Sequence, residues 1–256
     1  MNILICIKQV PDMESKFKIN AAGTWYDRTD LAWRMNEYDE YAVEQAVRLK
    51  EQVGNADLTV LCIGPDQVKE TMKKALAMGC DRGVHVADND AHQREPIEIA
   101  SMIAGFARDK NFDIIFTGMQ SQDRGSAQVG VMVAELLDLP AVTTIVGFTF
   151  DNGAVQVKRE LEGGGKGLVS ATTPVVLTCQ LGLNTPRYPT LPNIMKAKKK
   201  ELLTLAPDPG ALGAFQETIA LFFPERKGGG LVLEGELPAL ADKLIHLLKE
   251  KTGVLA

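Results

Sequence analysis

The segment from Gly118 to Gly130 has the composition of a loop that could bind a phosphate group. It reads GMQSQDRGSAQVG, and it offers a hydroxyl at Ser126 and a guanidinium at Arg124. Small residues allow the backbone to approach a ligand, and the segment leads into a helical pattern whose N-terminal dipole favours an anion. The same residues also fit an ordinary turn with glycine at a capping position, so both interpretations stay open.

Other reactive residue types are scattered along the chain. The three histidines, His85, His92 and His246, have no cysteine or carboxylate at metal-ligand spacing, so we predict no metal site. The four cysteines lie beside apolar segments without C-x-x-C spacing, which indicates structural burial in a reducing compartment such as the cytoplasm. The 118–130 loop matches neither a Walker A nor a G-x-G-x-x-G motif, and nothing nominates a nucleophile or a general base. We therefore predict no catalytic residue.

Apolar segments of strand length alternate with amphipathic segments through the first two thirds of the chain. We expect strands at 3–10, 58–63, 84–87, 114–117 and 142–146, and helices at 36–53, 65–78, 96–110 and 126–137, with Asn36 capping the first helix. Strands buried on both faces and separated by helices predict a doubly wound α/β domain with a mostly parallel sheet. Ligands bind such a sheet beyond the carboxyl ends of its strands, where the 118–130 loop would lie.

The remaining segments depart from this alternation. Residues 17–25 predict a small hairpin, and residues 141–177 predict antiparallel strands around a glycine turn. Three prolines at positions 186, 189 and 192 predict an extended strap, because proline is disfavoured inside helices and sheets. An irregular stretch is expected at 207–230 and a terminal helix at 237–251. We therefore expect a nucleotide-binding α/β domain at 1–185 and a tail at 186–256 that packs on another surface.

Charge is unevenly distributed along the chain. The formal charge is −5, but residues 186–200 contain five basic side chains and no acidic one, so the rest of the chain carries −10. The lysines fit a solvated surface, and they also fit a segment that steers an acidic partner. Overall acidity argues against nucleic-acid binding. No segment reads as a signal peptide or a membrane span, so we expect no membrane insertion.

Several motifs together resemble the beta-subunit family of electron transfer flavoproteins. The strap LNTPRYPTLPNIMKAKKK at 183–200 resembles the recognition loop of that family. The segments CIKQV at 6–10, ALAMGCDRG at 75–83 and the loop at 120–130 are similar to family motifs. The hairpin VKRELEGG at 157–164, followed by PVVLT at 174–178, resembles the family signature. This resemblance covers the whole chain and implies a Rossmann-like fold of the adenine nucleotide alpha hydrolase type.

The resemblance implies a heterodimer with an alpha subunit, in which FAD shared with that subunit carries electrons and the beta subunit binds AMP. It makes residues 186–256 a recognition loop and a C-terminal arm that packs on the partner subunit. The chain would be an electron carrier rather than a stand-alone enzyme. It would take electrons from flavin dehydrogenases such as acyl-CoA dehydrogenase, in fatty acid oxidation, and pass them to a membrane-bound quinone oxidoreductase or another acceptor. The implied nucleotide positions are Cys6, Asn36, Glu37, Tyr38, Asp39, Ile63, Gln120, Ser121, Gln122, Asp123, Arg124, Gly125, Ser126, Ala127, Gln128, Val129, Gly130 and Val131. Met13 and Tyr38 match positions near the flavin ring.

The same resemblance implies that the strap docks the dehydrogenase. The implied positions are Arg187, Leu191, Pro192, Ile194, Met195, Lys196 and Lys199. Leu191 would insert into an apolar pocket of the partner, an arrangement suited to a hot spot because the prolines reduce the ordering cost. Two alternatives remain. One is an electron-bifurcating beta subunit that binds a second FAD and works with NADH, and the other is a nucleotide-binding regulatory module without a redox role.

Overall fold

The computed structural model describes residues 1–208, 210, 213–225 and 230–251. Parts of the expected irregular stretch (209, 211–212, 226–229) and of the expected arm (252–256) lie outside the described residues. Two compact units are present, Met1–Ala220 and Leu221–Ala256. The second unit contains α6 (Leu237–Lys251), which confirms the predicted terminal helix. In the described part of the chain, none of the helices has the length and apolar character needed to cross a membrane.

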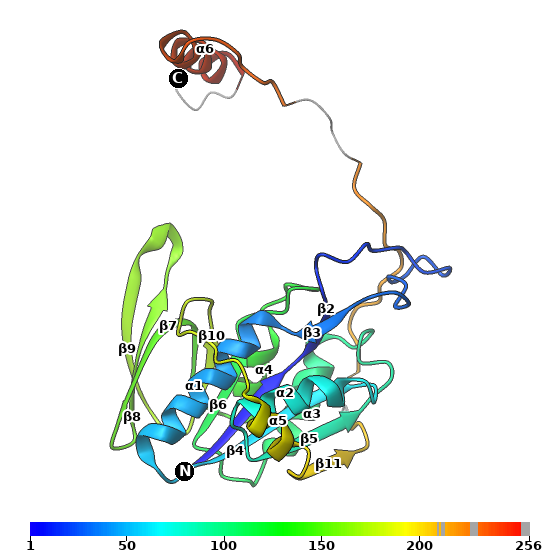
Figure 1. Ribbon diagram of the computed structural model, residues 1–256, viewed down its shortest axis with the longest axis vertical. Coiled ribbons are helices and arrows are strands. Elements are labelled where there is room, and N and C mark those ends of the chain that lie inside the picture. Colours follow the sequence, from blue (N-terminus) through cyan, green and yellow to red (C-terminus); the bar gives the residue numbers. More distant parts are fainter. Residues whose placement is uncertain (209, 211–212, 226–229, 252–256) are drawn as a thin grey trace. The chain divides into compact units, whose positions relative to one another are not determined.

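In the described residues, the first unit is built on a nine-stranded sheet in the order β11-β5-β4-β1-β6-β10-β7-β8-β9 (Figure 1). Its strands are β1 (Asn2–Ile7), β4 (Asp57–Gly64), β5 (Arg82–Ala87), β6 (Ile114–Gly118), β7 (Ala141–Asp151), β8 (Ala154–Glu160), β9 (Lys166–Thr172), β10 (Val175–Cys179) and β11 (Leu202–Leu205). Pairing is parallel from β11 to β7 and antiparallel among β7, β8 and β9. The predicted mostly parallel α/β fold is confirmed, and so are the antiparallel strands as far as Thr172. The prediction is wrong for residues 175–177, because they belong to β10, which pairs in parallel with β6 and β7.

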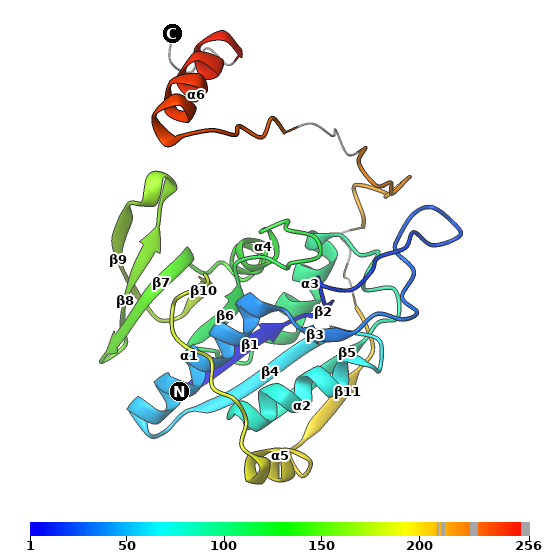
Figure 2. The same cartoon turned by 45° about the horizontal axis from the view of Figure 1, so that its top comes forward.

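Helices cover both faces of the parallel part of this sheet (Figure 2). On one face lie α1 (Glu37–Val53) and α2 (Val68–Met78), and on the other lie α3 (Pro96–Ala107) and α4 (Val129–Leu136). Successive side chains of β1 point to opposite faces, so Ile3 and Ile5 pack toward α1 and α2 while Leu4 packs toward α3 and α4. Both faces are therefore dry, which explains the unbroken apolar strand sequences.

The chain order places a topological switch between β1 and β6. From β1 the chain continues to β4 and β5 on one side, and it then returns to β6 on the other side of β1. The connections that follow β1 and β6 lead away in opposite directions, which opens a crevice at the carboxyl ends of these two strands. The 118–130 loop follows β6 directly and therefore lies at this crevice.

The single strand predicted at 3–10 is wrong, because the chain forms two strands there. β1 ends at Ile7, and β2 (Gln9–Pro11) pairs with β3 (Trp33–Met35) in a separate two-stranded sheet. The break falls at Lys8 because its N–H donates to the Asp39 carboxylate at 2.6 Å. This N–H is therefore not available for pairing with a neighbouring strand of the main sheet.

The predicted hairpin at 17–25 is confirmed only as a minimal antiparallel contact. This segment is described throughout, and it forms one isolated bridge, Ile19 with Tyr26, in place of two strands. Its turn is closed by hydrogen bonds around Asn20, whose N–H donates to the Trp25 carbonyl at 2.8 Å.

Two helices begin three residues later than predicted. Residues 65–67 form a turn in which the Val68 N–H donates to the Pro65 carbonyl at 2.9 Å, and α2 starts at Val68. α4 starts at Val129 because Ala127 has a φ of 53°, which a right-handed helix does not accommodate.

The prediction of an extended strap is wrong for Leu191–Ala197, which form the short helix α5. Pro192 lies in the first turn of this helix, where no intrahelical hydrogen bond needs its missing N–H. The Thr190 hydroxyl caps the helix by accepting a hydrogen bond from the Asn193 N–H at 3.4 Å. After α5 the chain adds β11 to the edge of the sheet beside β5, a strand that the hydrophobic pattern did not predict.

Candidate functional site

A pocket opens in the first unit at the carboxyl ends of β1, β4 and β6. Cys6 and Lys8 come from the end of β1, Ile63 from β4 and Thr117 from β6. The loop at 120–130 supplies a further wall. The pocket therefore occupies the crevice produced by the switch between β1 and β6.

Most of the nucleotide positions implied by the resemblance line this one pocket. They are Cys6, Asn36, Asp39, Ile63, Gln120, Ser121, Asp123, Arg124, Ser126, Ala127, Gln128, Val129 and Gly130. The remaining positions, Met13, Glu37, Tyr38, Gln122, Gly125 and Val131, do not line it. Two of these hold each other, because Gln122 Nε2 donates to Glu37 Oε2 at 2.9 Å. The structure thus gathers residues from separate segments of the chain and leaves a few beside the pocket.

Asp39, in the first turn of α1, joins the two strands that flank the crevice. Its Oδ2 accepts the Lys8 N–H at 2.6 Å, and its Oδ1 accepts the Gly118 N–H at 3.1 Å. A Cβ at position 118 would lie 2.2 Å from that Oδ1, so the contact requires glycine there. Burial raises the pKa of Asp39 to about 7, although hydrogen bonds from Asn36, Lys8 and Gly118 favour its charged form.

Asn36 holds the 120–130 loop against α1. It occupies the predicted N-cap position, but its side chain makes no capping hydrogen bond, so the prediction of its role is wrong. Its Nδ2 instead donates to the Gln120 carbonyl at 2.8 Å and to Asp39 at 3.0 Å, and its Oδ1 accepts the Gln122 N–H at 3.0 Å. With 1% of its surface exposed, this amide fixes the start of the loop from within the protein.

Gly130 lets α4 approach the sheet closely. A Cβ at this position would lie 2.6 Å from Thr117 Oγ1 on β6 and 2.7 Å from Thr178 Cγ2 on β10. The residues at the start of α4 line the pocket, so the positive end of the helix dipole faces it. The first turn of α4 can therefore present N–H groups to an anion.

Cationic side chains surround the pocket. Arg28, Arg94 and Arg124 line it, but the guanidinium of Arg94 already pairs with the buried carboxylates of Asp88 and Glu98 at 2.9 and 3.0 Å. Arg124 donates to the Arg94 carbonyl at 2.6 Å, which links the loop to the start of α3. Lys8 Nζ lies 2.7 and 2.8 Å from the two carboxylate oxygens of Asp123, so this buried acid is neutralised. The arrangement suits a ligand that carries negative charge.

Sequence reasoning missed one wall of the pocket. Tyr26, Arg28 and Trp33 come from the segment before and within β3, and His92 and Arg94 come from the segment before α3. These segments have no hydrophobic period, and their basic and aromatic content was the only available signal. Burial lowers the pKa of His92, and its buried Nδ1 has no partner among the described residues. The residues that the structure describes also contain no cluster of three or more His, Cys, Asp or Glu that could hold a metal ion.

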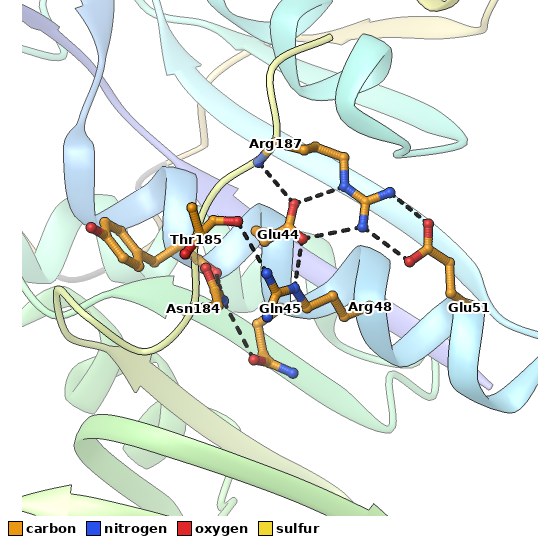
Figure 3. A network of polar contacts seen from close by, with 8 residues as sticks. Glu44, Gln45, Arg48, Glu51, Asn184, Thr185 and Arg187 are labelled. Carbon is orange, nitrogen blue, oxygen red and sulfur yellow. Dashed lines mark hydrogen bonds and ion pairs between the residues drawn. The ribbon is translucent and has the colours of Figure 1, made fainter. Parts of the chain in front are cut away.

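None of the residues implied for docking lines the pocket. Most of them are exposed on or beside α5, namely Leu191, Pro192, Ile194, Met195, Lys196 and Lys199. Leu191 is 73% exposed, and Ile194 and Met195 on the same helix are exposed as well, so the apolar residues form a group. Arg187 differs from the others, because its guanidinium turns toward α1 and pairs with Glu44 and Glu51 (Figure 3).

The basic charges of residues 186–200 separate into two groups. Arg187 is paired within the chain, and Lys200 Nζ donates to the carbonyls of Leu76 and Cys80 at the end of α2, at 2.9 and 2.5 Å. Three lysines, at positions 196, 198 and 199, remain exposed. The outward charge of the segment is therefore smaller than its composition indicates.

Comparison with known proteins identifies the family. Residues 23–209 match the model of the electron transfer flavoprotein domain. The chain is similar to the electron transfer flavoprotein subunit beta of Bacillus subtilis, with 36% identity over 261 residues that span the whole of both chains. Identity to the subunit beta of Homo sapiens is 35% over 256 residues, covering 98% of this chain and 97% of the relative. The chain belongs to the electron transfer flavoprotein family, among its beta subunits.

Proposed function

We propose that this chain pairs with an alpha subunit to form a heterodimer that carries electrons from flavin dehydrogenases to an acceptor. Family membership supports electron transfer through a flavin, and the name of the relatives, subunit beta, supports an alpha partner. FAD shared with the alpha subunit would supply the redox chemistry, while the residues of this chain bind and orient. We further propose a cytoplasmic heterodimer in fatty acid oxidation, with acyl-CoA dehydrogenase as electron donor and a membrane-bound quinone oxidoreductase as acceptor.

We assign AMP to the pocket at the β1–β6 switch. The observation that carries this proposal is the convergence of the 120–130 loop, the start of α4 and two arginines, Arg28 and Arg124, on one crevice at the strand ends. Backbone N–H groups and guanidinium groups would hold the phosphate. Ile63 and Cys6 would pack against the base. Burial raises the pKa of the Cys6 thiol well above its usual range, so this side chain stays neutral and apolar.

We assign Met13 and Tyr38 to the side of the chain that meets FAD. Both lie outside the pocket lining, and Met13 is 41% exposed. The Tyr38 hydroxyl accepts a hydrogen bond from Gln120 Nε2 at 3.0 Å, which ties this ring to the nucleotide loop. A change in the loop could thereby alter the position of the ring that meets the flavin.

We assign the docking of the dehydrogenase to residues 188–199, with Leu191 as the anchor. Leu191 and Met195 are exposed apolar side chains on one short helix, 73% and 55% exposed. Exposed lysines at positions 196, 198 and 199 lie directly beside them in sequence. An apolar anchor with a charged rim is the arrangement typical of a binding hot spot, and the rim would steer an acidic partner.

The test is to co-express the chain with its alpha subunit, purify the heterodimer, denature it and count the released cofactors. One FAD and one AMP per heterodimer are the expected result. Two FAD molecules without AMP would instead indicate the bifurcating form, with a second FAD in the pocket. Absence of flavin would reject both redox functions and favour a regulatory module that binds a nucleotide.

A further inference from the structure

The Pro-rich strap is attached to α1 by an ion-pair network around one buried carboxylate (Figure 3). At its centre is Glu44, whose side chain is 3% exposed. Its Oε2 accepts the Nε–H and the backbone N–H of Arg187 at 2.8 and 3.1 Å. Its Oε1 accepts from Arg48 at 2.6 Å and from the Nη2 of Arg187 at 3.1 Å. Both oxygens of this carboxylate are therefore saturated by donors.

The same network extends along α1 on both sides of Glu44. The guanidinium of Arg187 also pairs with Glu51, with contacts of 2.5 and 3.0 Å. Arg48 donates to the Thr185 carbonyl at 3.1 Å, and Asn184 Nδ2 donates to the Tyr41 carbonyl at 3.0 Å. Residues 184–187 are thus held on α1 at several points, and Arg187 directs its fork of donors to two acids of its own chain.

The docking segment is attached again at its other end. Ala197, the last residue of α5, is 3% exposed and belongs to the core that includes α2. Lys200 donates to the Leu76 and Cys80 carbonyls at the C-terminal end of α2. Between the two attachments, Tyr188, Leu191 and Met195 are 91%, 73% and 55% exposed. α5 itself lies against α2, so the contacts of Arg187 fix the stretch that leads into the helix, and α2 and Lys200 fix its far end.

A buried carboxylate is costly unless it is paired, and removing one partner leaves the other charge unpaired. Burial alone would raise the pKa of Glu44, but the hydrogen bonds from Arg187 and Arg48 lower it below its ordinary value. Glu44 is therefore ionised and holds Arg187 at neutral pH. A loop that is ordered before binding loses less entropy when it meets its partner.

We propose that Glu44 and Arg187 are positioning residues for docking, which hold residues 188–195 in the conformation that a flavin dehydrogenase binds. This inference rests on the proposed docking function. It assigns Arg187 to the attachment of the strap within this chain, in place of a direct contact with the partner. The expected consequence is that breaking the pair weakens docking even though Leu191 itself is unchanged.

The test uses the heterodimer with Glu44→Gln. The introduced amide removes the charge and replaces one acceptor oxygen by an N–H donor, so the ion pair at position 44 is lost without a change in side-chain size, and Arg187 keeps only its contact with the exposed Glu51. With a flavin dehydrogenase as the electron donor, KM for the dehydrogenase should rise at least fivefold, while kcat and FAD content stay at the wild-type values. Hydrogen exchange of amides 188–195 should become faster.

The matched control is Glu40→Gln, one turn earlier on α1. Glu40 pairs with Lys74 of α2 at 2.6 Å, away from the strap, so its replacement removes a similar ion pair at the wrong place. KM and the exchange of amides 188–195 should stay at the wild-type values in this control. If Glu44→Gln loses FAD through misfolding, Arg187→Gln provides the same comparison from the side of the strap.

The outcomes separate the two proposals. If Leu191→Ala raises KM but Glu44→Gln and Arg187→Gln do not, docking stands and the positioning role is wrong. If Leu191→Ala also leaves KM unchanged, the docking function itself fails. A rise of KM in the Glu40→Gln control equal to that of Glu44→Gln would show a general loss of stability and would also overturn the positioning role.

Discussion

The nucleotide pocket and the docking segment are built in opposite ways. The pocket is a crevice between strand ends, and its buried polar side chains, such as Asn36 and Asp39, hold one another by hydrogen bonds. The docking segment exposes apolar side chains, such as Leu191, and its buried polar contacts lie beneath it at Glu44. Changes in the pocket should therefore lower both the unfolding free energy and nucleotide binding, whereas changes at the docking surface should lower only the affinity for the dehydrogenase.

We expect the largest effect from Gly130→Val, a substitution in the nucleotide pocket. The Cβ alone would lie 2.6 Å from Thr117 Oγ1, so α4 must move away from β6. Overpacking of this kind costs about 1–3 kcal/mol of unfolding free energy. We also expect the purified heterodimer to lose its AMP. Urea unfolding and nucleotide analysis measure the two effects.

Gly105→Ala is the matched control for this prediction. Gly105 lies in α3, and a Cβ there would meet nothing within 4 Å. Replacement of an exposed helical glycine by alanine should stabilise the protein by about 0.5–1 kcal/mol and leave AMP in place. If Gly130→Val retains full stability and full AMP content, the close packing of α4 is not what shapes the pocket.

The second effect concerns the docking side. Leu191→Ala removes an exposed anchor, and loss of a hot-spot side chain costs about 2 kcal/mol of binding, or about 30-fold in affinity. KM for the dehydrogenase should rise by that order. Unfolding free energy and FAD content should stay near the wild-type values, because Leu191 is 73% exposed.

Leu203→Ala on β11 is the control for Leu191→Ala. Leu203 is 46% exposed and lies outside the docking segment, so KM should stay unchanged. A loss of FAD in Leu191→Ala, without a change in KM, would place this residue at the subunit interface and contradict its role in docking.

The third prediction, again for the nucleotide pocket, is a slope of the unfolding free energy against pH. Burial raises the pKa of Asp39 from its ordinary value of 3.8 to about 7 in the folded chain. Between these pH values the folded chain therefore holds a proton on Asp39 that the unfolded chain has lost. Its contribution therefore favours folding below pH 4 and is lost as pH rises through about 7. The slope is at most about 1.4 kcal/mol per pH unit for one group.

Asp39→Asn should remove this slope. Urea unfolding of both proteins from pH 4 to pH 8 gives the measurement, and the wild type should lose stability relative to the variant over that range. If the two pH profiles run parallel, the Asp39 carboxyl does not change its protonation on folding in this range.

The pocket was predictable from the sequence to the extent that it depends on strand ends. The 118–130 loop follows an apolar strand, and the sheet rule alone places such a loop at the carboxyl edge. The wall formed by Arg28 and Trp33 was not predictable, because the segment before β3 has no hydrophobic period and β3 is placed by its pairing with β2, about 20 residues earlier. The predicted capping role of Asn36 was wrong for a similar reason, since its side-chain amide donates to the carbonyl of Gln120, 84 residues later in the chain.

The docking segment shows a different limit. Proline was expected to exclude a helix, yet its cost depends on position, and Pro192 stands in the first turn where that cost is absent. The attachment of the strap could not be predicted at all. Glu44 and Arg187 are separated by 143 residues, and no local pattern pairs two charges at that distance. Composition therefore overstated the charge that this segment presents to a partner.

The most direct test of the central claim, that the nucleotide and the dehydrogenase use separate sites on this chain, is a crystal structure of the heterodimer with its alpha subunit. The claim predicts density for one AMP in the pocket, with its phosphate against residues 120–130 and the start of α4, and an exposed Leu191 remote from any nucleotide. Density for a flavin in this pocket would contradict the assignment of AMP. A pocket filled by alpha-subunit side chains would contradict the nucleotide site altogether.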